Sequence, residues 1–173
     1  MIGVGGISTG AILGLPERIN LLPHSDDPAA WPTSVLVGIT NGAAVADPLG
    51  GTSARALTFA ADSGRIYANA SFTGPLSGRT FTASVYVRAP SGKARIVVAG
   101  NSDTQYVYSD VILTPLWQRI SRTVTCGASD TVIRLALENR AGAGASDILA
   151  GVVEVFGGMI QEAAAVSTYE RAL

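Results

Sequence analysis

The sequence predicts an all-β fold, an antiparallel β-sandwich of about eight to ten strands preceded by an apolar arm. Three observations favour this class. The stretch 80–99 alternates apolar and polar residues with a period of two, as a strand with one buried face does. Similar segments recur at intervals of roughly 10 to 15 residues, separated by Gly, Pro, Ser and Asp. No stretch has a convincing amphipathic helical pattern.

The stretch 80–99 is the clearest element of the chain. Phe81, Val85 and Val87 fall on one side of a strand, and the residues between them are mostly polar. The turn sequence PSGK follows, in which Gly92 can adopt a positive φ, and the alternation then resumes. This pattern predicts a β-hairpin formed by two consecutive strands.

The remaining elements follow in chain order. Residues 20–34 are expected to form an irregular segment interrupted by prolines. Strands are expected at 35–39, in a short segment that ends at about residue 60, and at 65–72, 105–113, 117–126, 131–138 and 148–160. This number of strands is typical of a jelly-roll sandwich. Its predicted core is lined by Phe81, Val85, Val87, Ile96, Val98, Ile120, Val124, Leu135 and Val155.

Two regions are expected: an assembly arm at residues 1–19 and a jelly-roll domain at residues 20–173. The arm is apolar and rich in glycine, and it has no charged residue before Glu17. We expect it to order by packing on neighbouring subunits of a homo-oligomer, through the apolar residues Ile2, Val4, Ile7, Ile12 and Leu13. The alternatives are a strand or short helix of the domain itself, or a secretory signal, although the latter usually begins with a positive charge.

Composition restricts the classes of partner. Charged residues make up 14% of the chain and its formal net charge is −1, so we expect no nucleic-acid partner. No window approaches the ~20 consecutive apolar residues of a membrane-spanning helix, so we expect no membrane partner. Cys126 is the single cysteine, which excludes an intrachain disulfide, and we expect it to be a buried, unreactive thiol.

The residues that could carry catalysis or bind a cofactor are few. His24 is the single histidine and lies among prolines, so a turn or packing role is favoured over catalysis or zinc binding. Asp26 and Asp27 are adjacent carboxylates that could bind a structural Ca²⁺, although SDDP is also an ordinary turn. We therefore expect no enzymatic activity and no cofactor, with calcium as the open alternative.

Three tyrosines are the candidates for glycan binding. Tyr86 shares a strand face with Thr82 and Arg88, and Tyr106 and Tyr108 share a face of their own strand. Aromatic rings stack on the apolar faces of sugars, so these side chains could form a binding platform. The alternative is that they are amphipathic side chains of a surface or a subunit interface.

Several segments of the sequence resemble the single-domain jelly rolls of bacteriophage structural proteins, which are related in shape to carbohydrate-binding modules. These segments are NLLPHSDDPAAW at 20–31, DPLGGTSARALTF, RTFTASVYVRA, PLWQRISRTVT and VEVFGGMIQEAAAVSTY. The last strand of that family typically ends in an aromatic residue followed by Gly, Ala, Gln, Leu and Glu, and residues 156–162 here read FGGMIQE. Met159 replaces the Gln, so no role of that Gln is transferred to this chain.

The resemblance implies a non-catalytic structural protein of the virion, in a tail fibre, a tail tip or a capsid decoration, that assembles with other virion proteins. It also implies a homo-oligomer, most often a trimer, assembled in the host cytoplasm. The alternative function is a carbohydrate-binding module that attaches a particle or an enzyme to cell-surface glycans.

Overall fold

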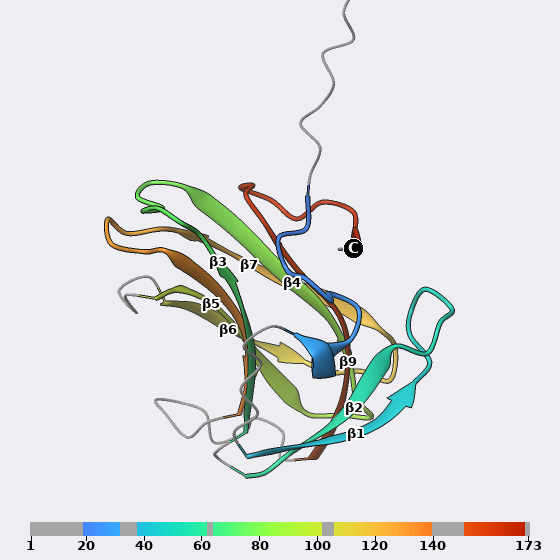
Figure 1. The fold of residues 1–173 in the computed structure, drawn as a ribbon. Helices are drawn as coiled ribbons and strands as arrows, with labels where there is room; N and C mark the ends of the chain where they lie inside the picture. The colour runs from blue at the N-terminus through green and yellow to red at the C-terminus, as the bar shows by residue number, and fades with distance from the viewer. Residues whose placement is uncertain (1–18, 32–37, 62–63, 102–105, 140–150, 172–173) are drawn as a thin grey trace, which may run out of the picture.

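The computed structural model describes residues 19–31, 38–61, 64–101, 106–139 and 151–171. Within these ranges the chain forms nine antiparallel strands and one short 3₁₀ helix (Figure 1). The elements are η1 (Pro28–Ala30), β1 (Ile39–Val45), β2 (Ala54–Phe59), β3 (Arg65–Ser71), β4 (Thr80–Arg88), β5 (Lys93–Gly100), β6 (Tyr106–Ile112), β7 (Gln118–Thr125), β8 (Val132–Glu138) and β9 (Gly151–Gln161). The predicted all-β jelly-roll sandwich is confirmed.

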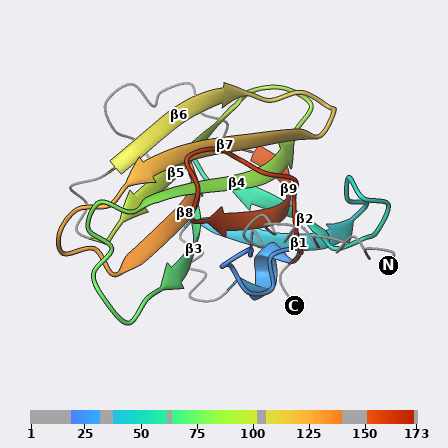
Figure 2. The same ribbon diagram turned by 90° about the horizontal axis from the view of Figure 1, so that it is seen from above.

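The strands form two sheets that pack face to face. The five-stranded sheet has the order β1-β2-β9-β4-β7, and the four-stranded sheet has the order β3-β8-β5-β6. Figure 2 shows the same arrangement from above. Within the described ranges, no helix is long and apolar enough to span a bilayer.

The core lies between the sheets, where the alternating apolar side chains of both sheets meet. All nine residues predicted to line it are buried, with at most 7% of each side chain exposed. Cys126 is also buried in this cluster, as predicted, and burial raises the pKa of its thiol. Leu22 and Trp31 add apolar side chains from the N-terminal segment to the same core.

The predicted hairpin of the 80–99 stretch is wrong. β4 pairs with β7 and β9 in one sheet, whereas β5 pairs with β6 and β8 in the other. Gly92 has the expected positive φ of 102°, but the short link crosses the sandwich from one sheet to the other. The inward side chains of β4 and β5 therefore face each other across the core, which preserves the alternation without strand pairing.

The first strand also differs from its prediction. It begins at Ile39 and runs to Val45 as an edge strand with mostly exposed side chains, so its sequence carries no clear alternation. A bulge interrupts its pairing with β2, and a Cβ on Gly42 would lie 2.5 Å from the Ala56 carbonyl oxygen. The predicted positions 35–37 lie outside the described residues, as does the expected assembly arm up to residue 18, including Ile2, Val4, Ile7, Ile12 and Leu13.

Candidate functional site

The outward side chains of the four-stranded sheet form a face that we call the tyrosine face. Strand register places them in rows across the sheet, and the edge strands β3 and β6 supply its tyrosines. Its rows are Arg65–Glu138–Arg95–Asp110, Tyr67–Ala136–Val97–Tyr108 and Asn69–Arg134–Ala99–Tyr106. The middle row thus has the small side chains Ala136 and Val97 at its centre, whereas the two flanking rows carry charged side chains on the central strands β8 and β5.

Tyr106 and Tyr108 are the most exposed aromatic side chains of this face, at 38% and 47%. Their ring centroids lie 5.8 Å apart with a 55° angle between the ring planes. The alternation of β6 places both on the solvent side, as predicted, because Val107 between them packs against the core. They therefore form a continuous aromatic surface.

Two polar contacts fix these tyrosines. The guanidinium of Arg95 lies 4.4 Å from the centroid of the Tyr108 ring, and it donates to both oxygens of Asp110 at 2.7 and 3.0 Å. The Tyr106 hydroxyl donates to Oε1 of Glu138 at 2.6 Å. Since Glu138 belongs to β8, the ring of Tyr106 must extend across β5 to reach it. Both rings are therefore held in place before any ligand arrives, which lowers the entropic cost of binding.

The opposite edge of the face is organised around Tyr67. Its ring packs on a small cluster of Val97, Ala99 and Ala136. The guanidiniums of Arg65 and Arg134 lie 5.1 and 4.9 Å from its centroid, respectively, within the range of cation–π contacts. This edge therefore presents cations beside an aromatic ring.

The outward side of the five-stranded sheet is different, because residues 163–171 pack across it. We call its buried part the covered face, formed by Ser84, Tyr86, Arg119, Phe156 and Met159. The ring of Tyr169 lies 5.9 Å from that of Tyr86 and 5.5 Å from that of Phe156. The structure therefore does not bring Tyr86 together with Tyr106 and Tyr108. Tyr86 lies on the other sheet, beneath the C-terminal segment.

Arg119 is the polar centre of the covered face. Its guanidinium donates to Oγ of Ser84 at 2.9 Å and to the carbonyl oxygen of Ser167. It also lies 5.6 and 5.9 Å from the ring centroids of Tyr86 and Tyr169, respectively. Burial lowers the pKa of Arg119. These contacts tie the C-terminal segment to β4 and β7.

The sequence FGG at 156–158 of β9 allows the N-terminal and C-terminal segments to pack closely on this strand. The register with β4 shifts between Ser84 and Tyr86, so that Phe156 and Met159 both contact the covered face. Gly157 has a φ of 65°, and a Cβ there would lie 3.2 Å from the rings of both Tyr86 and Tyr169. A Cβ on Gly158 would lie 2.6 Å from the Trp31 ring. The two glycines therefore provide a bulge with close packing on both sides.

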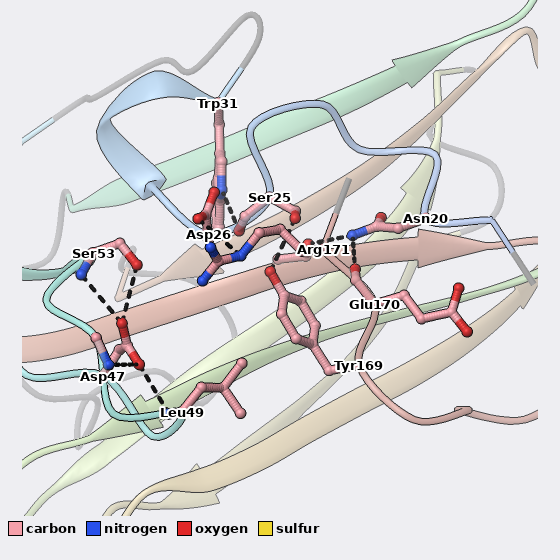
Figure 3. Close-up of polar contacts among 12 residues, drawn as sticks. Asn20, Ser25, Asp26, Trp31, Asp47, Leu49, Ser53, Tyr169, Glu170 and Arg171 are labelled. Atoms are coloured by element: carbon pink, nitrogen blue, oxygen red, sulfur yellow. Dashed lines mark hydrogen bonds and ion pairs between the residues drawn. The ribbon is translucent and has the colours of Figure 1, made fainter. Parts of the chain in front are cut away.

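The two ends of the described chain are bound to each other and to β9 (Figure 3). Asn20 donates to the carbonyl oxygens of Gly158 and Glu170, and its Oδ1 accepts from the backbone N–H groups of Leu22 and Ile160. The Ser25 and Tyr169 hydroxyls form a hydrogen bond of 2.9 Å. Asn20 therefore links the N-terminal segment, β9 and the C-terminal segment through hydrogen bonds.

The candidate calcium ligands lie in this same N-terminal segment. Asp26 forms an ion pair with Arg171 at 3.2 Å, and Asp27 accepts from Arg55 at 2.9 and 3.0 Å. Asp27 also accepts from the backbone N–H of Ala29 and so caps η1. A cation would have to displace these arginines, and no group of three or more His, Cys, Asp or Glu that could hold a metal occurs in the described ranges. His24 is exposed in a turn with a φ of 52°.

Sequence analysis missed Tyr67, Arg65 and Arg134 as site residues. The signal was present, because Ile66, Ala68 and Ala70 alternate with Arg65, Tyr67 and Asn69 along β3. That pattern predicts an outward row. The pattern within one strand does not reveal that β3 and β6 border the same face.

No protein-family model and no curated protein matches the sequence. Solved structures do match. The chain is similar to the tandem carbohydrate-binding domain CBM22-1–CBM22-2 of Xyn10C from Paenibacillus barcinonensis, with 16% identity and a TM-score of 0.61, over 87% of this chain and 47% of that one. It is similar to TmCBM61, solved in complex with β-1,4-galactotriose, with 13% identity and a TM-score of 0.50, over 84% and 99% of the two chains.

A third similar structure is the enzymatically active domain of tailspike protein 4 from bacteriophage CBA120, with 12% identity and a TM-score of 0.50. The match covers 82% of this chain and 21% of that one. At these identities the matches show the fold. They agree with the jelly-roll sandwich that the order of strands in the two sheets gives.

Proposed function

We propose that this domain is a non-catalytic carbohydrate-binding module that binds a glycan on the tyrosine face. The observation that carries the proposal is the exposed pair Tyr106 and Tyr108, fixed in place by Glu138 and Arg95. Sugar rings have apolar faces that stack on aromatic rings, and their hydroxyls bind the polar side chains around them. The tyrosine face offers both kinds of group on one rigid sheet.

The contrast between the two sheets supports this location. The covered face has aromatic side chains too, but residues 163–171 occupy the position that a ligand would need. TmCBM61 has a related fold and was solved with a bound oligosaccharide, which supports glycan binding as the class of function.

The carboxylates of the tyrosine face support binding rather than catalysis. Asp110 is held by both guanidinium nitrogens of Arg95, and Glu138 accepts from the Tyr106 hydroxyl. A general acid or base must exchange a proton with the substrate, whereas these carboxylates position the side chains around them. We therefore assign them a structural role in the binding face.

The test is a glycan array probed with the whole chain, followed by titration calorimetry on the glycans that bind. Tyr106→Ala and Tyr108→Ala should each weaken binding about tenfold or more, because each removes a stacking surface. Tyr108→Phe is the matched control and should retain binding, since it keeps the ring. A blank array, or alanine variants that bind as well as the parent, would contradict the proposal.

A second role is assembly into a virion, as a tail-fibre, tail-tip or decoration subunit with other virion proteins, most often as a homotrimer. The resemblance noted in the sequence and the similarity in fold to a phage tailspike domain support it. The arm at residues 1–19 would mediate this assembly. Its deletion should leave the melting temperature unchanged and abolish oligomers in sedimentation; an unchanged oligomeric state would refute the role of the arm.

A further inference from the structure

We infer that the ligand of the tyrosine face is an anionic glycan, whose sugar rings carry carboxylate or sulfate groups. The inference rests on the proposed function and concerns which glycans the face selects. Its basis is the placement of three arginines, Arg65, Arg95 and Arg134, in the rows of one sheet face beside the tyrosines.

The guanidiniums of Arg95 and Arg65 are engaged differently. Arg95 is 7% exposed, and both of its hydrogen-bonding nitrogens are directed to Asp110. Arg65 is half-buried and lies against the Tyr67 ring; its Nε is buried and has no hydrogen-bond partner among the described residues.

In the three rows of the face, the three arginines Arg65, Arg95 and Arg134 outnumber the two carboxylates, Glu138 and Asp110. Glu138 is only 4% exposed, and its register neighbours on both sides are arginines, Arg65 and Arg95. Asp110 is exposed, but it is held by Arg95. Two of these arginines lie on the β3 side of the face, Arg65 on β3 itself and Arg134 on the neighbouring β8, and both contact the Tyr67 ring.

The aromatic and cationic parts lie close enough for one oligosaccharide to contact both. β3 and β6 are separated by three strand intervals, roughly 14 Å in all. The Tyr106 hydroxyl reaches Glu138, which is paired in register with Arg65. A sugar ring stacked near Tyr106 could thus place its charged substituent at Arg65 or Arg134, where a planar guanidinium matches a carboxylate or sulfate oxygen pair.

The test uses the whole chain on an array of neutral, C6-oxidised uronate and 6-O-sulfated forms of β-1,4-linked glucan, mannan and galactan. The anionic forms should bind about tenfold or more tightly than the neutral form of the same backbone, and the advantage should fall as salt is added. Comparing binding of the uronate and sulfated forms shows whether the arginines prefer carboxylate or sulfate. Equal binding of the neutral forms would overturn this inference and leave the proposed function standing. Absence of binding to every form would overturn both.

Single substitutions locate the selectivity. Arg65→Gln and Arg134→Gln should each lower the ratio of anionic to neutral binding about tenfold. Arg171→Gln is the matched control, because it removes the same charge from an exposed arginine that pairs with Asp26 beside the C-terminal segment. Melting temperatures confirm that each variant is folded. If Arg171→Gln lowers the preference as much as the other two, the effect is one of net charge and the inference is wrong.

Discussion

Both outward faces of this sandwich contain an arginine packed against tyrosine rings, but only one face is covered by another segment of the chain. On the covered face, Arg119 lies between Tyr86 and Tyr169 beneath a segment of the same chain. On the tyrosine face, Arg95 lies against Tyr108, but the ring remains 47% exposed. The difference is therefore what lies above each tyrosine: the ring of Tyr86 is covered by the C-terminal segment, whereas the ring of Tyr108 remains exposed to solvent.

The comparison predicts a large difference in stability between equivalent substitutions. Phe156 is fully buried beneath Tyr169, so Phe156→Ala should lower the free energy of unfolding by about 3 to 5 kcal/mol, because it leaves a cavity. Tyr108→Ala removes an exposed ring and should cost less than about 1 kcal/mol. Denaturant unfolding measures both. Similar losses for the two variants would show that the faces are equally important for folding.

A smaller difference is expected for the arginines. Arg119→Ala leaves the Ser84 hydroxyl and the Ser167 carbonyl without their donor, which should cost about 1 to 3 kcal/mol. Arg65→Ala removes a side chain whose Nε has no hydrogen-bond partner among the described residues. The free energy of unfolding should therefore change by about 0.5 kcal/mol or less. The same unfolding experiment compares them. A loss at Arg65 as large as that at Arg119 would show that the tyrosine face also stabilises the fold.

The smallest effect concerns the pH dependence of the N-terminal segment that supports the covered face. The hydrogen bond from Arg55 lowers the pKa of Asp27 below its ordinary value of 3.8. A lowered pKa in the folded state contributes stability above about pH 4, and this contribution is lost as the pH falls through the folded pKa. Asp27→Asn should therefore be less stable than the parent at pH 6, and the difference should shrink towards pH 2.

Thermal unfolding of both proteins from pH 6 to pH 2 measures this effect. The same measurement on Asp110→Asn, which removes the carboxylate partner of Arg95, compares an ion pair of the tyrosine face with the Asp27–Arg55 pair. A parent-to-variant difference for Asp27→Asn that stays constant down to pH 2 would contradict the assignment of this carboxylate as a stabilising, ionised partner of Arg55.

The period-two alternation was sufficient to predict the class of fold and the inward side of the strands that show it, because a strand between water and a core must place apolar residues at every second position. The residues of β4, β5, β7, β8 and β9 predicted to line the core are therefore all buried. Alternation does not identify the neighbouring strand, since either sheet of a sandwich buries the same side chains. For this reason β4 and β5 were predicted as a hairpin, although they belong to opposite sheets.

The site shows the same division between sequence and tertiary structure. The sequence alone determined that Tyr86, Tyr106 and Tyr108 lie on the outward sides of their strands. Only the tertiary structure decided that residues 163–171 pack over Tyr86, and that β3 brings Tyr67, with Arg65 beside it, to the face that Tyr106 and Tyr108 share. Outward direction follows from the local geometry of one strand, whereas burial or exposure of an outward side chain depends on contacts with segments far away in the chain.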